Sequence, residues 1–455
     1  MDKTNKLGEE KISKLLLSFS APAIIGLLVN AMYNVIDRAV IGRGVNELGI
    51  AGITIGFPIQ IVMMAFGMLV GIGATSLVSI RLGEGKKKEA EKIMGNAVTL
   101  LIALSVILTV LGLIFLDPML RTFGASDAVL PYARDYMKVI LIGMIFGSLA
   151  FGMNNFIRAD GNPKTAMLTL LISALINAVL APVFILIFKW GMVGAGLATT
   201  IAQFISGVWT LSYFLMGKSS LKLYLKNLLP DFKIVKNIFI IGLPPFSMQM
   251  ANSLLNVILN KTLMIYGGDL AISGMGIINS LQLLLLLPVI GVSQGAQPII
   301  GFNFGARKYE RIKETLKYAV SAATAIVVIG YILTRLFPQQ FIGIFASDEA
   351  LVSFATHALI VYFFCIPVLG FQIIGASYFQ AVGKMKPAMF LNLSRQGIIL
   401  IPAILILSKI YGLNGVLYAG PLADFSAAVI TFIWLWKDIR NLKDDDVQEE
   451  LALEA

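Results

Sequence analysis

The sequence has almost no cysteine or histidine, two residues that many enzyme and metal sites use. Its 455 residues include one cysteine, Cys365, and one histidine, His357. A single cysteine excludes an intrachain disulfide framework and a CxxC site, and a single histidine excludes an HExxH zinc site. No GxxxxGK[ST] run occurs, so the chain lacks the loop with which many proteins bind ATP phosphates. We therefore expect no enzyme activity, no cofactor and no direct use of ATP.

Charge is also scarce. Only 14% of the residues are charged, whereas 57% are hydrophobic, and soluble globular domains average about 25% charged residues. This composition predicts an all-α integral membrane protein, because only helices and closed barrels satisfy their backbone groups in lipid.

Long apolar runs dominate the chain instead. A membrane-spanning helix needs roughly 20 consecutive, mostly apolar residues. Twelve such runs are present, at about 15–41, 50–80, 96–116, 132–157, 165–188, 192–216, 237–265, 271–302, 316–337, 352–380, 388–408 and 412–436.

The basic residues between these runs favour one side. The segments on the side of the N-terminus carry 26 Lys or Arg, and those on the other side carry 9. Basic residues are enriched on the cytoplasmic side of membrane proteins, so we expect both termini in the cytoplasm. The formal net charge of +10 then reflects topology and contact with anionic lipids, not nucleic-acid binding.

The two halves of the chain resemble each other. When Asn30 is aligned with Asn252 without gaps, 14 of the 57 positions from 30 to 86 are identical. Apolar composition inflates chance matches, but it does not explain further paired polar residues such as Asn34 with Asn256 and Gln60 with Gln282. Because six spans separate the equivalent positions, the halves are parallel repeats about an axis along the membrane normal.

The repeat predicts a domain organisation. We expect an N-terminal six-helix lobe at 1–216, a basic cytoplasmic linker at 217–236, a C-terminal six-helix lobe at 237–436 and an acidic cytoplasmic tail at 437–455. Such halves commonly form two bundles around a cavity that opens alternately to each side.

A polar face with a carboxylate marks the first span. Gly26, Asn30, Asn34 and Asp37 share one face of a helix by their spacing. A charge inside a span costs roughly 2.5–3.5 kcal/mol on insertion scales. An unpaired buried carboxylate favours its neutral form, so Asp37 is a candidate to load and release a proton, or to bind Na⁺ beside amide oxygens. An ion pair with Arg38 or solvation at the helix end is the alternative.

Other polar residues fall inside the spans. We predict a substrate cavity lined by Asn30, Asn154, Asn155, Gln203, Asn252, Asn256, Gln282 and Gln294. Hydrogen bonds that join neighbouring helices are the alternative role for several of them. Arg395 and Asp424 lie in consecutive spans and form a candidate structural ion pair, with a part in coupling as the alternative.

Four segments together resemble the multidrug and toxic compound extrusion (MATE) family, in its prokaryotic branch. They are NVIDRAVIGRGVNELGIAGITIGFPI at 34–59, FIRADGNPK at 156–164, GVSQGAQPIIGFNFGA at 291–306 and SRQGIILIP at 394–402. The resemblance covers about residues 12–440. It implies a twelve-helix antiporter in the cytoplasmic (inner) membrane that exports organic, often cationic and aromatic compounds in exchange for H⁺ or Na⁺. We expect a monomer whose partners are these small molecules and membrane lipids.

The resemblance also implies a cation-coupling site in the first lobe. Its first-helix acid matches Asp37, its fifth-helix asparagine matches Asn177 and its sixth-helix threonine matches Thr199. The polar face of the first span adds Asn34 as a candidate oxygen ligand, independently of the resemblance. Relatives often read N-x-x-L-D-P in the fifth helix, but this chain reads NAVLAP at 177–182, with Ala181 in place of the second acid.

Three other functions remain open from the sequence. A lipid-linked saccharide flippase shares this architecture, but it usually needs several cavity cations for phosphate. An intramembrane enzyme such as a prenyl transferase would need clustered carboxylates to hold a metal. A receptor or scaffold would follow if Ala181 abolishes coupling.

Overall fold

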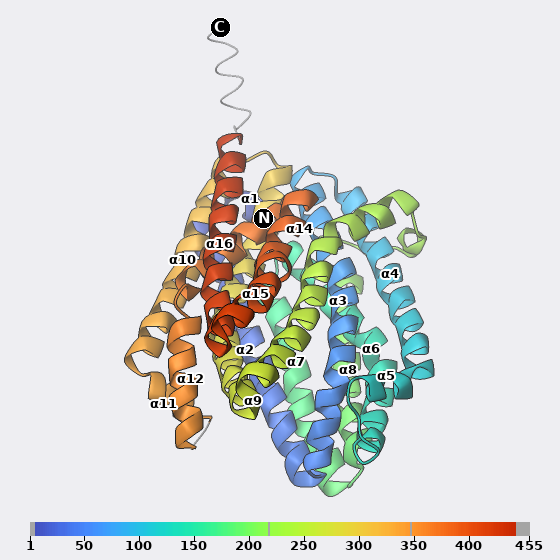
Figure 1. Ribbon diagram of the computed structural model, residues 1–455. Helices are drawn as coiled ribbons and strands as arrows, with labels where there is room; N and C mark the ends of the chain where they lie inside the picture. The colour runs from blue at the N-terminus through green and yellow to red at the C-terminus, as the bar shows by residue number, and fades with distance from the viewer. Residues whose placement is uncertain (1–4, 217–218, 346–347, 443–455) are drawn as a thin grey trace. The chain divides into compact units, whose positions relative to one another are not determined.

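The computed structural model describes residues 5–216, 219–345 and 348–442 (Figure 1). These residues are helical almost throughout, and no strand occurs among them. The all-α class expected from composition is therefore correct. The tail expected at 437–455 lies outside the described residues from position 443 onward.

The helices group into two compact units. The first unit takes in residues up to Glu9 and Ile25–Phe246, and the second takes in Glu10–Ile24 and the residues from Ser247 onward. Two helices, α2 (Ile12–Gly44) and α9 (Phe232–Gly305), therefore contribute residues to both units.

The remaining elements before α9 belong to the first unit. They are α1 (Asn5–Glu9), α3 (Glu47–Gly83), α4 (Lys87–Ile114), α5 (Leu116–Thr122), α6 (Leu130–Ala159), α7 (Pro163–Pro182), the π-helical segment η1 (Val183–Ile187), α8 (Gly191–Leu215) and the 3₁₀ turn η2 (Leu225–Leu228).

The elements after α9 belong to the second unit. They are α10 (Tyr309–Leu336), α11 (Pro338–Gly343), α12 (Glu349–Tyr362), the 3₁₀ turn η3 (Ile366–Val368), α13 (Leu369–Ala381), α14 (Met385–Leu393), the π-helical segment η4 (Ser394–Leu400), α15 (Ile401–Tyr411) and α16 (Leu413–Arg440).

The helices match the expected spans in number and place. Ten helical stretches among the described residues are long and apolar enough to cross a membrane, and the bent pair α12 and α13 adds an eleventh. One of the ten is the 74-residue α9, which is broken at Gly268 by a non-helical φ of 61°. Counting α9 as two spans gives the twelve that the sequence predicts.

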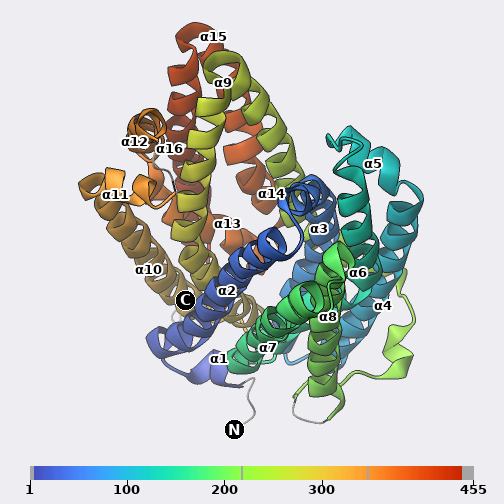
Figure 2. The same cartoon turned by 90° about the horizontal axis from the view of Figure 1, so that it is seen from below.

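In the first unit, α6 is the central helix. It packs against α3, α4 and α8, and α7 lies along α8 (Figure 2). The buried apolar cluster between them draws on α2, α3, α6, η1 and α8 through residues such as Ile41, Met137 and Ala198. This packing fixes the positions of the polar side chains that point into it.

Glycine allows one close crossing in this unit. A Cβ added at Gly242 would lie 1.7 Å from the Leu69 carbonyl oxygen, and one at Gly73 would lie 2.3 Å from that of Ile238. The start of α9 and the middle of α3 therefore touch through their backbones, as small residues permit between membrane helices.

The segment between the two halves is fixed to the first unit. The buried Asp160 carboxylate, after α6, accepts hydrogen bonds from the Tyr213 hydroxyl at 2.6 Å, the Ser219 hydroxyl at 2.8 Å and the Leu221 amide at 3.3 Å. Asn96 donates to the Asn227 carbonyl at 3.1 Å. The described part of the linker is thus hydrogen-bonded along its length.

In the second unit, α13 and α15 pack against α16, and α10 packs against α13. Phe363, Tyr378 and Phe379 are its largest fully buried side chains. Asp438, near the end of α16, accepts from the Tyr378 hydroxyl at 2.6 Å and pairs with Lys384 at 2.5 Å. These contacts hold the end of α16 against the turn after α13.

Candidate functional site

The carboxylate of Asp37 is the centre of the candidate site. It lies on α2 and is 7% exposed. Its Oδ1 has no hydrogen-bond partner among the described residues. Arg38, the next residue, is exposed, and no ion pair joins the two side chains in the described chain. The carboxylate is therefore buried without a salt bridge.

Asn177 and Thr199 meet in the same unit. The Asn177 Nδ2 donates to Thr199 Oγ1 at 2.9 Å, and Thr199 Oγ1 donates to the Ala195 carbonyl at 3.2 Å. Both side chains are buried, and Asn177 Oδ1 has no partner among the described residues. The structure thus joins two of the residues assigned to the coupling site and leaves a second buried oxygen acceptor without a donor.

Two tyrosines that were not predicted from the sequence lie between these groups. The Tyr33 side chain lies near Thr199 and within electrostatic range of Asp37. Tyr136, on α6, is buried and interacts with Tyr33, Asp37 and Gln60. Tyr33 precedes Asp37 by four residues, so helical spacing gave a signal for it. Nothing in the sequence near Tyr136 placed it beside α2.

Ala181 fills the position where relatives often have a second acid. It is 1% exposed and belongs to the buried apolar cluster with Ile41, Ile185 and Ala198. Position 181 therefore adds no second carboxylate to that of Asp37 and presents an apolar wall instead. The oxygens of Asp37 and Asn177 that have no partner among the described residues are suited to a proton or to a cation that prefers oxygen ligands.

The asparagines of the polar face bond along their own helix. The Asn34 Nδ2 donates to the Asn30 carbonyl at 2.8 Å, and the Asn256 Nδ2 donates to the Asn252 carbonyl at 2.8 Å. Asn34 and Asn256 are exposed, whereas Asn30 and Asn252 are half-buried. The repeated sequence thus forms the same local structure in both halves, and Asn34 has no hydrogen bond to Asp37 among the described contacts.

Asn154 and Asn155 surround a buried arginine. The Arg158 Nη2 donates to Asn154 Oδ1 at 2.7 Å and to Asn155 Oδ1 at 2.9 Å. The Asn154 Nδ2 donates to the Ala166 carbonyl at 2.6 Å. These amides hold the end of α6 and its contact with α7.

The glutamines assigned to the cavity lie on two helices, α8 and α9. Gln203 is half-buried on α8, where a Cβ on Gly147 of α6 would meet its Oε1 at 2.8 Å. Gln282 and Gln294 are half-buried on α9, and the enclosed Gln282 Nε2 has no partner among the described residues.

Arg395 and Asp424 are in contact in the second unit. The Arg395 Nε donates to Asp424 Oδ1 at 2.7 Å. Arg395 lies in η4 and Asp424 in α16.

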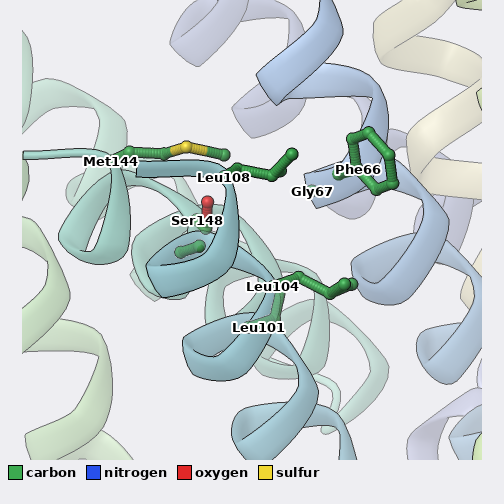
Figure 3. Close-up of a pocket in the computed structure, with 8 residues that line it drawn as sticks. Phe66, Gly67, Leu101, Leu104, Leu108, Met144 and Ser148 are labelled. Atoms are coloured by element: carbon green, nitrogen blue, oxygen red, sulfur yellow. The ribbon is translucent and has the colours of Figure 1, made fainter. Parts of the chain in front are cut away.

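A narrow crevice lies among α3, α4 and α6 (Figure 3). Phe66, Leu104, Leu108 and Met144 line it, and Ser148 is among its few polar groups. It has no space for a water molecule, so it is a packing defect, not a binding site.

Residues 291–295 read GVSQG, which fits the GxSxG pattern of serine hydrolases. In those enzymes the serine lies on a sharp turn between a strand and a helix. Ser293 lies inside the continuous second part of α9, so the pattern has no nucleophile geometry here.

The MatE family model matches residues 22–183 and again residues 244–406, which together make up well over half of the chain. The chain belongs to the MatE family. The two matches begin at positions 22 and 244, which are equivalent in the internal repeat, so this MatE chain carries the family unit twice.

Curated relatives of this MatE chain are named as export proteins. It is 29% identical over 433 residues to the multidrug export protein MepA of Staphylococcus haemolyticus, covering 95% of each chain. It is 28% identical over 429 residues to MepA of Staphylococcus aureus strain MRSA252, covering 94% of each chain. The chain is thus a multi-pass membrane protein of a bacterial transporter family.

Solved structures agree with this fold. The MATE multidrug transporter DinF-BH, solved with a bound compound, has a TM-score of 0.89 and 38% identity, covering 96% of this chain and 97% of that one. A multidrug resistance MATE transporter in an outward-facing conformation has a TM-score of 0.90 and 23% identity, covering 96% of this chain and 98% of that one. The second likeness shows the fold alone.

Proposed function

We propose that this MatE protein is a secondary active exporter of organic, often cationic and aromatic compounds. It exchanges them for H⁺ or Na⁺ by alternating access, and Asp37 takes the ion. The names of the MepA relatives and of DinF-BH support multidrug export. The substrates are small molecules, and the protein works as a monomer among membrane lipids with both termini in the cytoplasm.

The observation that carries the proposal is the buried, unpaired carboxylate of Asp37. A charge without a partner in an apolar surrounding is costly, and binding a proton or a cation removes that cost. Asn177 Oδ1 and the Asp37 carboxylate offer acceptors, while Tyr33 and Thr199 link α2 to α8. A change at Asp37 is thereby transmitted to the helices that contact it.

Ion binding drives export only if the ion binds the two access states differently. In the proposed cycle, the unloaded Asp37 favours the outward-open state, where it accepts the ion. Loading changes the contact of Tyr33, on α2, with Thr199, on α8, and weakens the drug site, so the drug leaves outward. The loaded carrier returns inward and releases the ion.

The chain offers bending points for this movement. The boundary between the compact units falls after Ile24 in α2 and after Phe246 in α9. These two positions are equivalent in the repeat, and Pro22 and Pro244 lie shortly before them. Proline removes a helical hydrogen bond and favours a bend, so we place the two bending points there.

The decisive experiment measures efflux from proteoliposomes with an imposed H⁺ gradient, an imposed Na⁺ gradient or neither. Ethidium and norfloxacin serve as transported probes. We expect one gradient to drive export by the unaltered protein, which identifies the ion. Asp37→Asn should abolish the gradient-driven part and keep the side-chain shape.

Asp127→Asn is the matched control, because the Asp127 side chain is 89% exposed and pairs only with Arg121 at the surface. It should export at the normal rate. Full gradient-driven export by a folded Asp37→Asn protein would contradict the role of Asp37. No export of either probe by the unaltered protein would contradict the proposed function itself.

A further inference from the structure

The ion pair of the second unit is only half formed. Arg395 Nε contacts Asp424 Oδ1 at 2.7 Å, whereas a full pair would add a second, parallel hydrogen bond. Among the described residues, Asp424 Oδ2 has no partner and is enclosed. The two amino nitrogens of Arg395 also have no hydrogen-bond partner in the described chain, yet they are not enclosed.

The accessible side of the pair is therefore the cation. The Arg395 side chain is 15% exposed and the Asp424 side chain 1%. A ligand that reaches the pair meets guanidinium N–H groups before it meets carboxylate oxygens. Because the pair is neutral overall, an anion can bind those N–H groups without being repelled by a second accessible acid.

Two further side chains lie near the pair. Tyr362, from α12, and Cys365, between α12 and η3, are within electrostatic range of Asp424. The neighbouring Ser394 donates to the Leu391 carbonyl at 2.8 Å within its own helix. Arg395 lies in a π-helical segment, and such segments are frequent at functional sites.

The repeat shows that the pair is an addition to one half. When Gly191 is aligned with Gly412, Ala202 falls on Ala423 and Phe204 on Phe425. This alignment places the neutral Gln203 opposite Asp424.

The partner cation is equally specific to the second half. Aligning Pro182 with Pro402 places Leu175 opposite Arg395. The fold therefore forms in the first half without either charge. Keeping two charges inside a span is expensive, so a role beyond the fold is needed to explain them.

We propose that the amino groups of Arg395 bind the carboxylate of an anionic or zwitterionic substrate, and that Asp424 is the positioning residue that orients the guanidinium. The planar fork of arginine matches a carboxylate with two parallel hydrogen bonds. The inference rests on the proposed export function, and it assigns the residue that holds the carboxylate of those substrates that carry one.

Two dyes that differ in one group test this site. Rhodamine 6G is an ethyl ester, and rhodamine 19 is the corresponding free acid with the same cationic ring system. Their affinities for the purified protein in nanodiscs are measured by fluorescence anisotropy at a pH where the acid is ionised. Replacing Arg395 and Asp424 together, as Arg395→Met with Asp424→Leu, removes both charges and leaves no unpaired ion.

We expect this double variant to bind rhodamine 19 at least about tenfold more weakly, the size of a charge-assisted hydrogen bond. Its affinity for rhodamine 6G should stay within about twofold. Arg395→Lys should give an intermediate loss, because lysine keeps the charge without the fork. Arg335→Met is the control, since Arg335 lies over the Tyr331 ring in the same unit and has no ion pair among the described residues.

An equal loss for both dyes, or no loss for either, would overturn the proposal. A measurement on the unaltered protein remains decisive if the double variant does not fold: benzoate should displace rhodamine 19 and not rhodamine 6G, and equal displacement of both dyes would also overturn it. Binding is measured without an ion gradient, so it does not depend on export. Failure of export would contradict the proposed function, whereas the dye affinities would still test the Arg395 site.

Discussion

Asn177 Nδ2 donates to Thr199 Oγ1 at 2.9 Å, and this bond fixes which end of the Asn177 amide is free. Because the donor is used, Oδ1 is the group left without a partner among the described residues. The contact thus presents an acceptor oxygen in the unit that contains the unpaired Asp37 carboxylate. Tyr33 also lies near Thr199, so this hydroxyl lies where side chains from α2, α7 and α8 meet.

Removing the Thr199 hydroxyl should weaken binding of the coupling ion and leave binding of the drug unchanged. We expect Thr199→Val to raise the ion concentration for half-maximal efflux about tenfold, because one hydrogen bond of roughly 1 kcal/mol or more orders the acceptor. Initial efflux rates across a series of H⁺ or Na⁺ gradients measure this. Thr210→Val is the control, since Thr210 is buried on the same helix and bonds only to the Ser206 and Gly207 carbonyls. Equal shifts in both variants would contradict the role of Thr199.

Introducing an acid at position 181 should make the thermal stability of the protein depend on Na⁺. Ala181→Asp places a carboxyl group within a buried apolar cluster, at a cost of roughly 2 kcal/mol or more. If the site accepts Na⁺, the metal offsets that cost by binding the two acids together. Thermal unfolding with and without NaCl measures the difference. The control is Ala133→Asp, in the same cluster on α6, which should lose the same stability with and without NaCl. If Ala181→Asp also loses the same stability in both buffers, Na⁺ does not bind between the two acids.

Much of the fold could be predicted from the sequence, because lipid allows few solutions. Runs of about 20 apolar residues predict helical spans, and the described helices follow them closely. The repeat is detectable in the sequence because Asn34 and Asn256 make the same local contact, in which the side-chain amide donates to the carbonyl four residues earlier. Asp37 was identifiable because a charge in a span is costly wherever the neighbours lie.

Contacts between distant helices were not predictable in the same way. Helical spacing tells which residues share a face, but not which helix that face meets. Tyr136 reaches the site only because α6 packs centrally in its unit. The sequence likewise does not show which polar group contacts Asn154 and Asn155. In the structure, both amides accept hydrogen bonds from Arg158.

The Asp160 carboxylate should be a large contributor to the stability of the first unit. It accepts from Tyr213, Ser219, Ser220 and Leu221. Asp160→Ala leaves several buried donors without an acceptor, so we expect a loss of roughly 3 kcal/mol or more in the free energy of unfolding. Urea unfolding, with hydrogen exchange at residues 219–221, measures the loss and its location. Asp127→Ala, at an exposed site, should change stability by less than about 0.5 kcal/mol. A similar small change in Asp160→Ala would contradict this account.

The two prolines near the unit boundaries should have matching effects on transport. Pro22 and Pro244 are equivalent in the repeat and lie shortly before Ile24 and Phe246, after which the boundary between the units falls. Replacing a helical proline by alanine restores a hydrogen bond and removes a cost of about 3 kcal/mol. We therefore expect Pro22→Ala and Pro244→Ala each to raise the unfolding temperature and slow export, with drug affinity unchanged, as measured by thermal unfolding, efflux and dye binding. Pro421→Ala, inside α16 and away from both boundaries, should raise stability without slowing export. If all three variants slow export alike, the bending points do not lie at the boundaries.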